Sequence, residues 1–314
     1  MLFSTGVQKM KGSSSRKADL QLKGPVEMTP RYRFGVSEFT TTPWTFEQDI
    51  ESYGQLGVEA IEVCEFKLDE QRMSEQLAMI AAHGLMISSV QPKVRTLFPS
   101  QSQPEPRDPR ERMALFSQTI QRFGPLAQGV PFVTNTGIPP QGNIQQVYDV
   151  AVEVYRELAD VAARFGARIA LEPLNPSILN IETAIWTIQQ ALDIVTRVQR
   201  ANFGLCIDSW NIWQTPDLYE AIKACGDRIF VVQLSDWRTP RSFQDRLSIG
   251  DGEIPFPAFL RAIHNSSFAG PYVVEIFSAD VPNPLWGGDL KQLIRDNRAN
   301  LETAWLVAFP QSAP

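Results

Sequence analysis

The chain alternates short apolar runs with segments of helical periodicity, and eight such apolar runs follow one another. Several runs are apolar on consecutive residues, as expected for strands that are covered on both faces. Alternation of such strands with amphipathic helices predicts βα units and a parallel sheet. The eight predicted strands span residues 32–40, 60–66, 86–92, 131–137, 168–174, 203–210, 229–236 and 271–278.

The segments between the runs carry helix signals. Thr45 and Gln48 form a capping box before an apolar stripe, and Gly57 ends that predicted helix. Apolar stripes also run from Ile144 to Phe165 and from Ile181 to Val195, where they predict two further helices. Residues 100–109 and 239–257 are predicted to be long loops that follow strands.

No linker interrupts the series, so we expect one domain over residues 31–310. Eight strand and helix units close most simply into a (β/α)8 TIM barrel, whose active site lies at the carboxyl ends of the strands. The alternative is a doubly wound open sheet. That fold normally carries a glycine-rich phosphate turn after its first strand, and GVSEFTTTP is not such a turn.

Four oxygen-bearing residues stand at or near the ends of four successive predicted strands: Glu172, Asp208, Gln233 and Glu275. In a parallel barrel their side chains would converge at one mouth. Hard oxygen donors without histidine or thiolate favour one divalent cation, Mn²⁺ or Mg²⁺, with Co²⁺ as a further option. A strand-end glutamate is often only a loop salt bridge, and Gln233 is equally well explained as a hydrogen-bonded core glutamine.

Other polar and aromatic residues are predicted near the same mouth. Trp210, Trp213 and Trp237 lie close in sequence to the candidate ligands Asp208 and Gln233. Their side chains would either line a pocket or pack under the loops. His83 and His264 fall in predicted outer helices, which removes Ser/His and Cys/His nucleophilic schemes. The candidates for substrate binding are Lys67, Asn211, Trp210, Trp237 and Arg238, and further mouth-facing candidates are Glu65, Lys93, Arg95, Asn135, Asn175 and Asp236.

Composition narrows the possible partners. The chain has 29 Lys plus Arg against 35 Asp plus Glu, a formal net charge of -6, which disfavours nucleic acid and leaves a small carbohydrate-like substrate. No apolar run is long enough for a membrane span. Three cysteines without CxxC spacing predict buried free thiols in the cytoplasm. Residues 1–30 are predicted to be a disordered extension, and a homo-oligomer is an open possibility.

Several segments resemble the xylose isomerase-like superfamily, in its sugar phosphate isomerase/epimerase branch. They include GVSEFTTTPWTFEQDI, LEPLNP, IDSWNIW, VVQLSDWR and EIFSADVPNPLW. The resemblance implies a barrel that binds one divalent cation through positions that fall on Glu172, Asp208, Gln233 and Glu275. The branch usually has histidine where Gln233 stands, although hydroxypyruvate isomerase-like members carry glutamine. It often shows DxxH after the sixth strand, where this chain has Asn211.

The expected chemistry is proton abstraction next to a carbonyl, through an enediolate, in an isomerase or epimerase of a sugar or related hydroxy-carbonyl compound. Glu172 and Glu275 are the predicted acid/base pair. A lyase using the same enediolate is the second hypothesis, with Asp236 or Lys67 as the acid. The metal nucleases of the superfamily need several histidines and a basic face, which this chain lacks. A catalytically inactive barrel is the remaining alternative.

Overall fold

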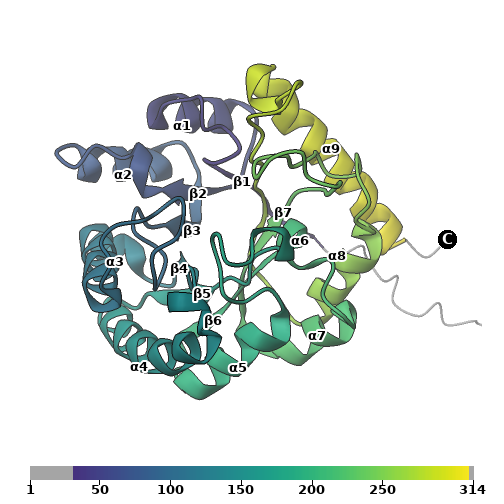
Figure 1. Ribbon diagram of the computed structural model, residues 1–314. Helices are drawn as coiled ribbons and strands as arrows, with labels where there is room; N and C mark the ends of the chain where they lie inside the picture. The colour runs from purple at the N-terminus through teal and green to yellow at the C-terminus, as the bar shows by residue number, and fades with distance from the viewer. Residues whose placement is uncertain (1–30, 311–314) are drawn as a thin grey trace, which may run out of the picture.

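Eight parallel strands close into a barrel in the computed structural model, which describes residues 31–310. Each strand pairs with the next along the chain, and β1 pairs with β8 to close the ring (Figure 1). The strands are β1 Phe34–Ser37, β2 Ala60–Cys64, β3 Met86–Gln91, β4 Pro131–Thr134, β5 Arg168–Leu171, β6 Phe203–Asp208, β7 Ile229–Leu234 and β8 Tyr272–Val274. The predicted single-domain TIM barrel is confirmed, and the open sheet is excluded.

Helices surround the barrel in the order that the sequence predicts (Figure 1). The one-turn helix α6 lies over the mouth, directly after β6. The helices are α1 Phe46–Gln55, α2 Met73–Ala82, α3 Pro109–Phe123, α4 Ile144–Ala163, α5 Ile188–Val198, α6 Ser209–Ile212, α7 Leu218–Cys225, α8 Phe256–Asn265 and α9 Leu290–Ala308. The 3-10 segments that join them are short.

Local sequence signals set most helix ends. Thr45 and Gln48 form the predicted capping box at the start of α1, and Gly57 follows that helix with a φ of 66°. The helix predicted to start at Ile181 begins only at Ile188, so that prediction was wrong at its first turns. A second capping box, between Thr187 and Gln190, fixes the later start.

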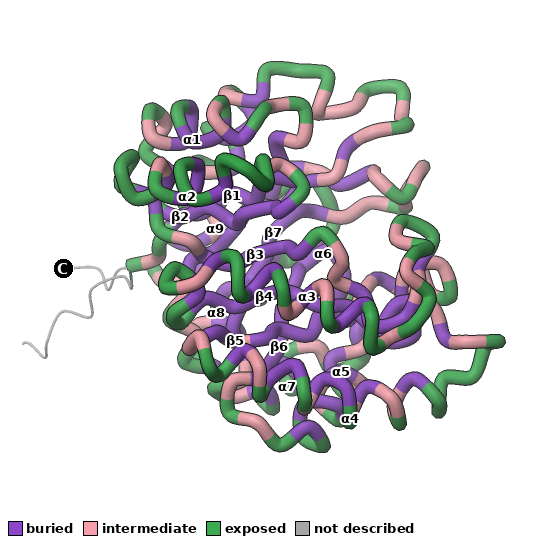
Figure 2. The backbone as a smooth tube through the Cα atoms, turned by 90° about the vertical axis from the view of Figure 1, so that its left-hand side faces the viewer, coloured by how far each residue is buried: buried purple, intermediate pink, exposed green. Residues whose placement is uncertain are grey.

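The strands are buried along nearly their whole length, whereas the outer helices alternate buried and exposed positions (Figure 2). Helix α4 illustrates the pattern, since its apolar stripe from Val147 to Ala162 packs on the barrel. Cys64, Cys206 and Cys225 are buried free thiols, as predicted. Within residues 31–310, no helix combines the length and apolar character that a membrane crossing requires. The predicted extension, residues 1–30, lies outside the described residues.

Candidate active site

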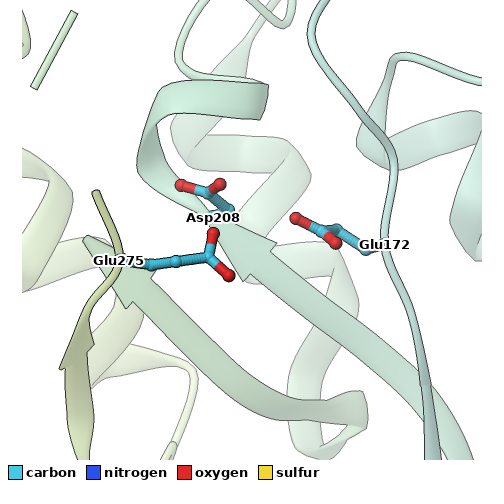
Figure 3. A group of neighbouring side chains, drawn as sticks. All are labelled: Glu172, Asp208 and Glu275. Atoms are coloured by element: carbon cyan, nitrogen blue, oxygen red, sulfur yellow. The ribbon is translucent and has the colours of Figure 1, made fainter. Parts of the chain in front are cut away.

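Three carboxylates meet at the carboxyl ends of the strands. Glu172 directly follows β5, Asp208 is the last residue of β6, and Glu275 directly follows β8. One oxygen from each lies within 4.8 Å of the others, and all three side chains are buried and point toward one another (Figure 3). Ligands of one hard cation, at roughly 2.0 to 2.6 Å from it, are separated by at most about 5 Å. The three carboxylates therefore fit one shared cation.

Neighbouring donors hold both oxygens of Glu172 and both oxygens of Asp208. Asn211 Nδ2 donates to both Glu172 Oε1 and Asp208 Oδ2, at 2.8 Å each. Asn135 Nδ2 donates to Glu172 Oε2 at 3.0 Å, and the Trp210 backbone N–H donates to Asp208 Oδ1 at 3.0 Å. Hydrogen bonds of this kind fix the orientation of metal-ligating carboxylates. The predicted site residue Asn211 thus bridges two of the predicted ligands.

Arg246 completes the group from the loop between β7 and α8. Its Nη1 lies 2.8 Å from Glu275 Oε2 and 2.9 Å from Asp208 Oδ2, with all three side chains at most 7% exposed. Its guanidinium stacks between the rings of Trp210 and Phe277, at 5.0 and 4.6 Å from their centroids. One positive charge is therefore built into the acidic group.

Gln233 faces the site with its amide nitrogen. Nε2 donates to Glu275 Oε1 at 2.8 Å and to both oxygens of Glu62, at 2.9 and 3.0 Å, while Oε1 accepts from the Cys206 thiol. Glu62, on β2, also accepts from Ser89 Oγ at 2.7 Å. An amide nitrogen cannot coordinate a cation, so Gln233 adopts here the core hydrogen-bonding role that was the alternative to a metal ligand. Coordination through its oxygen would require the amide to rotate.

Burial and crowding of like charges raise the pKa values of the three carboxylates. Burial, followed by repulsion from Asp208, raises the pKa of Glu172 to about 7. Burial also raises the pKa of Asp208 and, well above its usual range, that of Glu275, although Arg246 opposes both shifts. A carboxyl whose pKa lies near neutrality can both take up and return a proton, which suits acid–base chemistry.

A cavity of about 170 Å³ is lined by two of the three carboxylates, Glu172 and Glu275, whereas Asp208 does not line it. Pockets for drug-sized ligands are typically about 300 to 1,000 Å³, so this cavity suits one small molecule. Its lining combines polar side chains with aromatic rings. The lining residues are Phe39, Gln91, Arg95, Thr96, Ser102, Asn135, Glu172, Leu174, Ile178, Glu182, Trp210, Asn211, Phe243, Gln244, Arg246, Glu275 and Phe277.

Three predicted substrate-binding residues do not line this cavity. Lys67 forms a buried ion pair with Asp49 at 2.6 Å and donates to the Thr41 carbonyl oxygen at 2.8 Å. Arg238 forms an ion pair with Asp245. Trp237 packs on Trp213, with ring centroids 4.9 Å apart. Charge pairing and loop packing thus account for these three side chains, whereas Trp210 and Asn211 do reach the cavity.

Asp236 also lies away from the cavity. Its two oxygens accept hydrogen bonds from the backbone N–H groups of Trp237, Gly250, Gly252 and Ile254. These bonds shape the loop that carries Arg246. Asp236 is therefore a loop-organising residue.

Sequence reasoning missed Arg246 and Glu62. Arg246 lies in the long loop DRLSIGDGEI, where nothing in the local pattern separates it from Arg238 or Arg241. Glu62 did carry a signal, because it is a charged residue inside the apolar run AIEVC. A buried strand glutamate requires a partner, by the same argument that singled out Gln233.

Comparison with known proteins identifies the family of the chain. The family model described as "Xylose isomerase-like TIM barrel" matches residues 50–303. The chain belongs to this family. The resemblance noted in the sequence is confirmed, and the curated relatives of this xylose isomerase-like barrel include isomerases, epimerases and a dehydratase.

Four of the relatives are inosose isomerases, and the matches to two of them illustrate the range. That of Bacillus velezensis is 28% identical over 239 residues, which cover 74% of this chain and 83% of the relative. That of Bacillus subtilis is 32% identical over 153 residues, so the match spans about half (52%) of the relative's length and 47% of this chain. A 3-dehydroshikimate dehydratase of Pseudomonas aeruginosa is 31% identical over 132 residues, 39% of this chain and 20% of that protein.

Solved structures share the fold. A crystal structure of the IOLI protein with a binding zinc atom has a TM-score of 0.72 and 23% identity to this chain, and the match covers 89% of this chain and all of that one. D-psicose 3-epimerase from Clostridium cellulolyticum H10, solved with D-tagatose, has a TM-score of 0.69 and 20% identity, with 88% and 99% covered. At these identities the likeness establishes the barrel alone.

Proposed function

We propose that this xylose isomerase-like barrel is a cytosolic, divalent-metal-dependent isomerase or epimerase of a sugar or related hydroxy-carbonyl compound. The observation that carries the proposal is the meeting of Glu172, Asp208 and Glu275 beside a small cavity, which Glu172 and Glu275 line. The names of the curated relatives support the same class of reaction.

The three carboxylates would hold the cation, with Mn²⁺ or Mg²⁺ preferred by an all-oxygen donor set. When bound, the cation would stabilise the negative charge that builds on a carbonyl oxygen as a neighbouring carbon loses its proton. Gln233 would join the ligands only after its amide rotates. In the orientation described here it holds Glu275 in place.

Glu172 and Glu275 are the proposed acid and base, because they approach the cavity from different strands on either side of Asp208 (Figure 3). One carboxylate takes the proton from carbon, and the C–H electron pair becomes the double bond of the enediolate. Return of a proton to the same carbon from the opposite face gives the epimer, and return to the neighbouring carbon gives the isomer. Arg246 places a fixed positive charge beside the developing anion.

A lyase reaction through the same enediolate is the second candidate, supported by the dehydratase among the relatives. That reaction needs a separate acid to protonate the leaving hydroxyl. Asp236 and Lys67, the two acids considered from the sequence, are engaged elsewhere and do not line the cavity. The geometry therefore favours isomerisation or epimerisation.

Proton exchange tests the proposal. The protein is incubated with Mn²⁺ and a panel of ketoses and inososes in D₂O, and the mixture is followed by NMR. We expect deuterium in the unreacted compound and in its isomer or epimer, abolished by Glu275→Gln and retained by Glu157→Gln, a change in an exposed glutamate of α4. A dehydrated product would favour the lyase, and exchange undiminished in Glu275→Gln would remove Glu275 from its role.

A further inference from the structure

Arg95 lines the cavity, and no carboxylate of the described residues is bound to it. Its backbone is fixed, since its N–H donates to Gln103 Oε1 and its carbonyl oxygen accepts from Thr134 Oγ1 at 2.7 Å. Its guanidinium lies 5.5 Å from the centroid of the Phe39 ring and lines the cavity. Among residues 31–310, no Asp or Glu lies within ion-pair distance of this group.

The acids near Arg95 have other partners. Glu182 lines the same cavity, but its two oxygens accept hydrogen bonds from the Ser102 backbone N–H at 2.9 Å and from Ser102 Oγ at 2.7 Å. Glu172 is bound by Asn135 and Asn211. The Arg95 charge is therefore available to a ligand.

A second guanidinium adds positive charge under the same loop. Arg112 is fully buried, and its hydrogen bonds to Thr96 run to the carbonyl oxygen and to Oγ1, both neutral acceptors. Its remaining bonds go to the Pro106 carbonyl oxygen and the Gln103 side chain, which are also neutral. An arginine stays protonated at any physiological pH. Among residues 31–310, Arg95 at the cavity and the buried Arg112 beneath its loop therefore both lack a carboxylate partner within ion-pair distance.

An aromatic wall separates this charge from the carboxylates. Phe277 stacks against Arg246 at 4.6 Å and against Phe39, also at 4.6 Å, and Phe39 in turn faces Arg95. Two rings thus stand between the paired guanidinium of Arg246 and the unpaired one of Arg95. A ligand lying along this wall would place opposite ends at the carboxylates and at Arg95.

We infer that the substrate carries an anionic group, a carboxylate or a phosphate, at the end remote from its reacting carbonyl, and that Arg95 binds this group. The inference rests on the proposed function, because it takes the three carboxylates as the reacting end. A guanidinium matches the paired oxygens of either anion and forms charge-assisted hydrogen bonds with it. Arg95 would then favour anionic over neutral compounds that present the same carbonyl group to the carboxylates.

Calorimetric binding tests this inference without requiring turnover. The full-length protein is titrated with D-fructose, D-fructose 6-phosphate and 5-keto-D-gluconate, which share a ketose-type core and differ in charge. At least one anionic compound is expected to bind about tenfold or more tightly than fructose, because hydrogen bonds to charged groups contribute at this scale. The preferred anion distinguishes phosphate from carboxylate.

Variants of Arg95 test whether this residue causes the preference for the anionic compound. Arg95→Gln should weaken binding of the anionic compound about tenfold or more relative to binding of fructose, and Arg95→Lys should keep part of this preference as a point charge. Arg110→Gln, on the exposed side of α3, is the matched control and should behave as wild type. Equal binding of all three compounds, no measurable binding of either anion at millimolar concentration, or an equal loss for all three in Arg95→Gln would overturn the inference. Proton exchange in D₂O is measured separately, so the proposed function can fail or stand independently.

Discussion

The Arg246 guanidinium donates to the Glu275 carboxylate across 2.8 Å in an almost fully buried contact. The same nitrogen lies 2.9 Å from Asp208, so one fixed charge serves two proposed cation ligands. A cation bound by these carboxylates would share them with Arg246. The affinity for the cation should therefore depend on the Arg246 charge, and a titration can measure this dependence.

Replacing Arg246 with glutamine should raise the affinity for Mn²⁺ by about tenfold or more, because a nearby positive charge no longer repels the cation. The metal-free variant should lose about 3 to 5 kcal/mol of unfolding free energy, since two buried carboxylates lose their partner. Mn²⁺ titration and urea unfolding measure the two effects. Arg246→Lys keeps the charge and serves as control, and an unchanged Mn²⁺ affinity in Arg246→Gln would contradict this account.

Gln233→Glu changes one amide to a carboxylate of the same shape. The new group would face Glu62 and Glu275, to which the amide now donates. Without a cation we expect a loss of about 3 kcal/mol or more in unfolding free energy near pH 8, as for other uncompensated buried charges. Added Mn²⁺ should restore more stability to this variant than to wild type. Equal stability of the two proteins without metal would show that Gln233 is not held as described.

Lys67→Met distinguishes a structural role of Lys67, in its ion pair with Asp49, from a role in substrate binding. The buried ion pair with Asp49 predicts a loss of about 3 to 5 kcal/mol in unfolding free energy. Substrate affinity of the folded variant should be unchanged, because Lys67 does not line the cavity. Urea unfolding and KM report the two quantities. A raised KM with normal stability would instead support the role in substrate binding.

The raised pKa of Glu172 predicts how pH acts on the metal-free protein. Its folded-state value is about 7, against 4.5 ordinarily, so between these values the folded protein binds more protons than the unfolded one. Unfolding free energy should therefore fall by a few kcal/mol as pH rises from about 4.5 to 7. Cation binding requires the ionised carboxylate, so the rise in Tm caused by Mn²⁺ should grow over the same range. Glu172→Gln should flatten both profiles, and a Mn²⁺ effect independent of pH would refute the linkage.

The strand pattern predicted the barrel because its signal is local. Consecutive apolar residues such as those of β6 and β7 are read directly from the chain, and parallel closure then places Glu172, Asp208 and Glu275 at one mouth. The start of α1 was predicted where a capping box coincides with an apolar stripe, and that of α4 where its apolar stripe begins. The start of α5 was missed because the stripe continues upstream of Thr187.

Sequence reasoning failed in the loops because spacing alone does not show which acid pairs with a loop side chain. Lys67, Arg238 and Arg246 all follow strands and all carry positive charge. Only the fold reveals that Asp49 pairs with the first, Asp245 with the second and the carboxylate group with the third. Gln233 shows a further limit, since the sequence predicts its position but not which end of its amide faces Glu275.

Cation stoichiometry tests the central claim most directly. Wild-type protein, Asp208→Asn and the control Asp149→Asn, at an exposed position of α4, are loaded with Mn²⁺ and dialysed, and the bound metal is counted per chain. We predict one Mn²⁺ per chain in wild type and control, and a loss of most binding in Asp208→Asn. A wild-type protein that holds no Mn²⁺, or an Asp208→Asn variant that holds as much as wild type, would contradict a shared cation site and favour an inactive barrel.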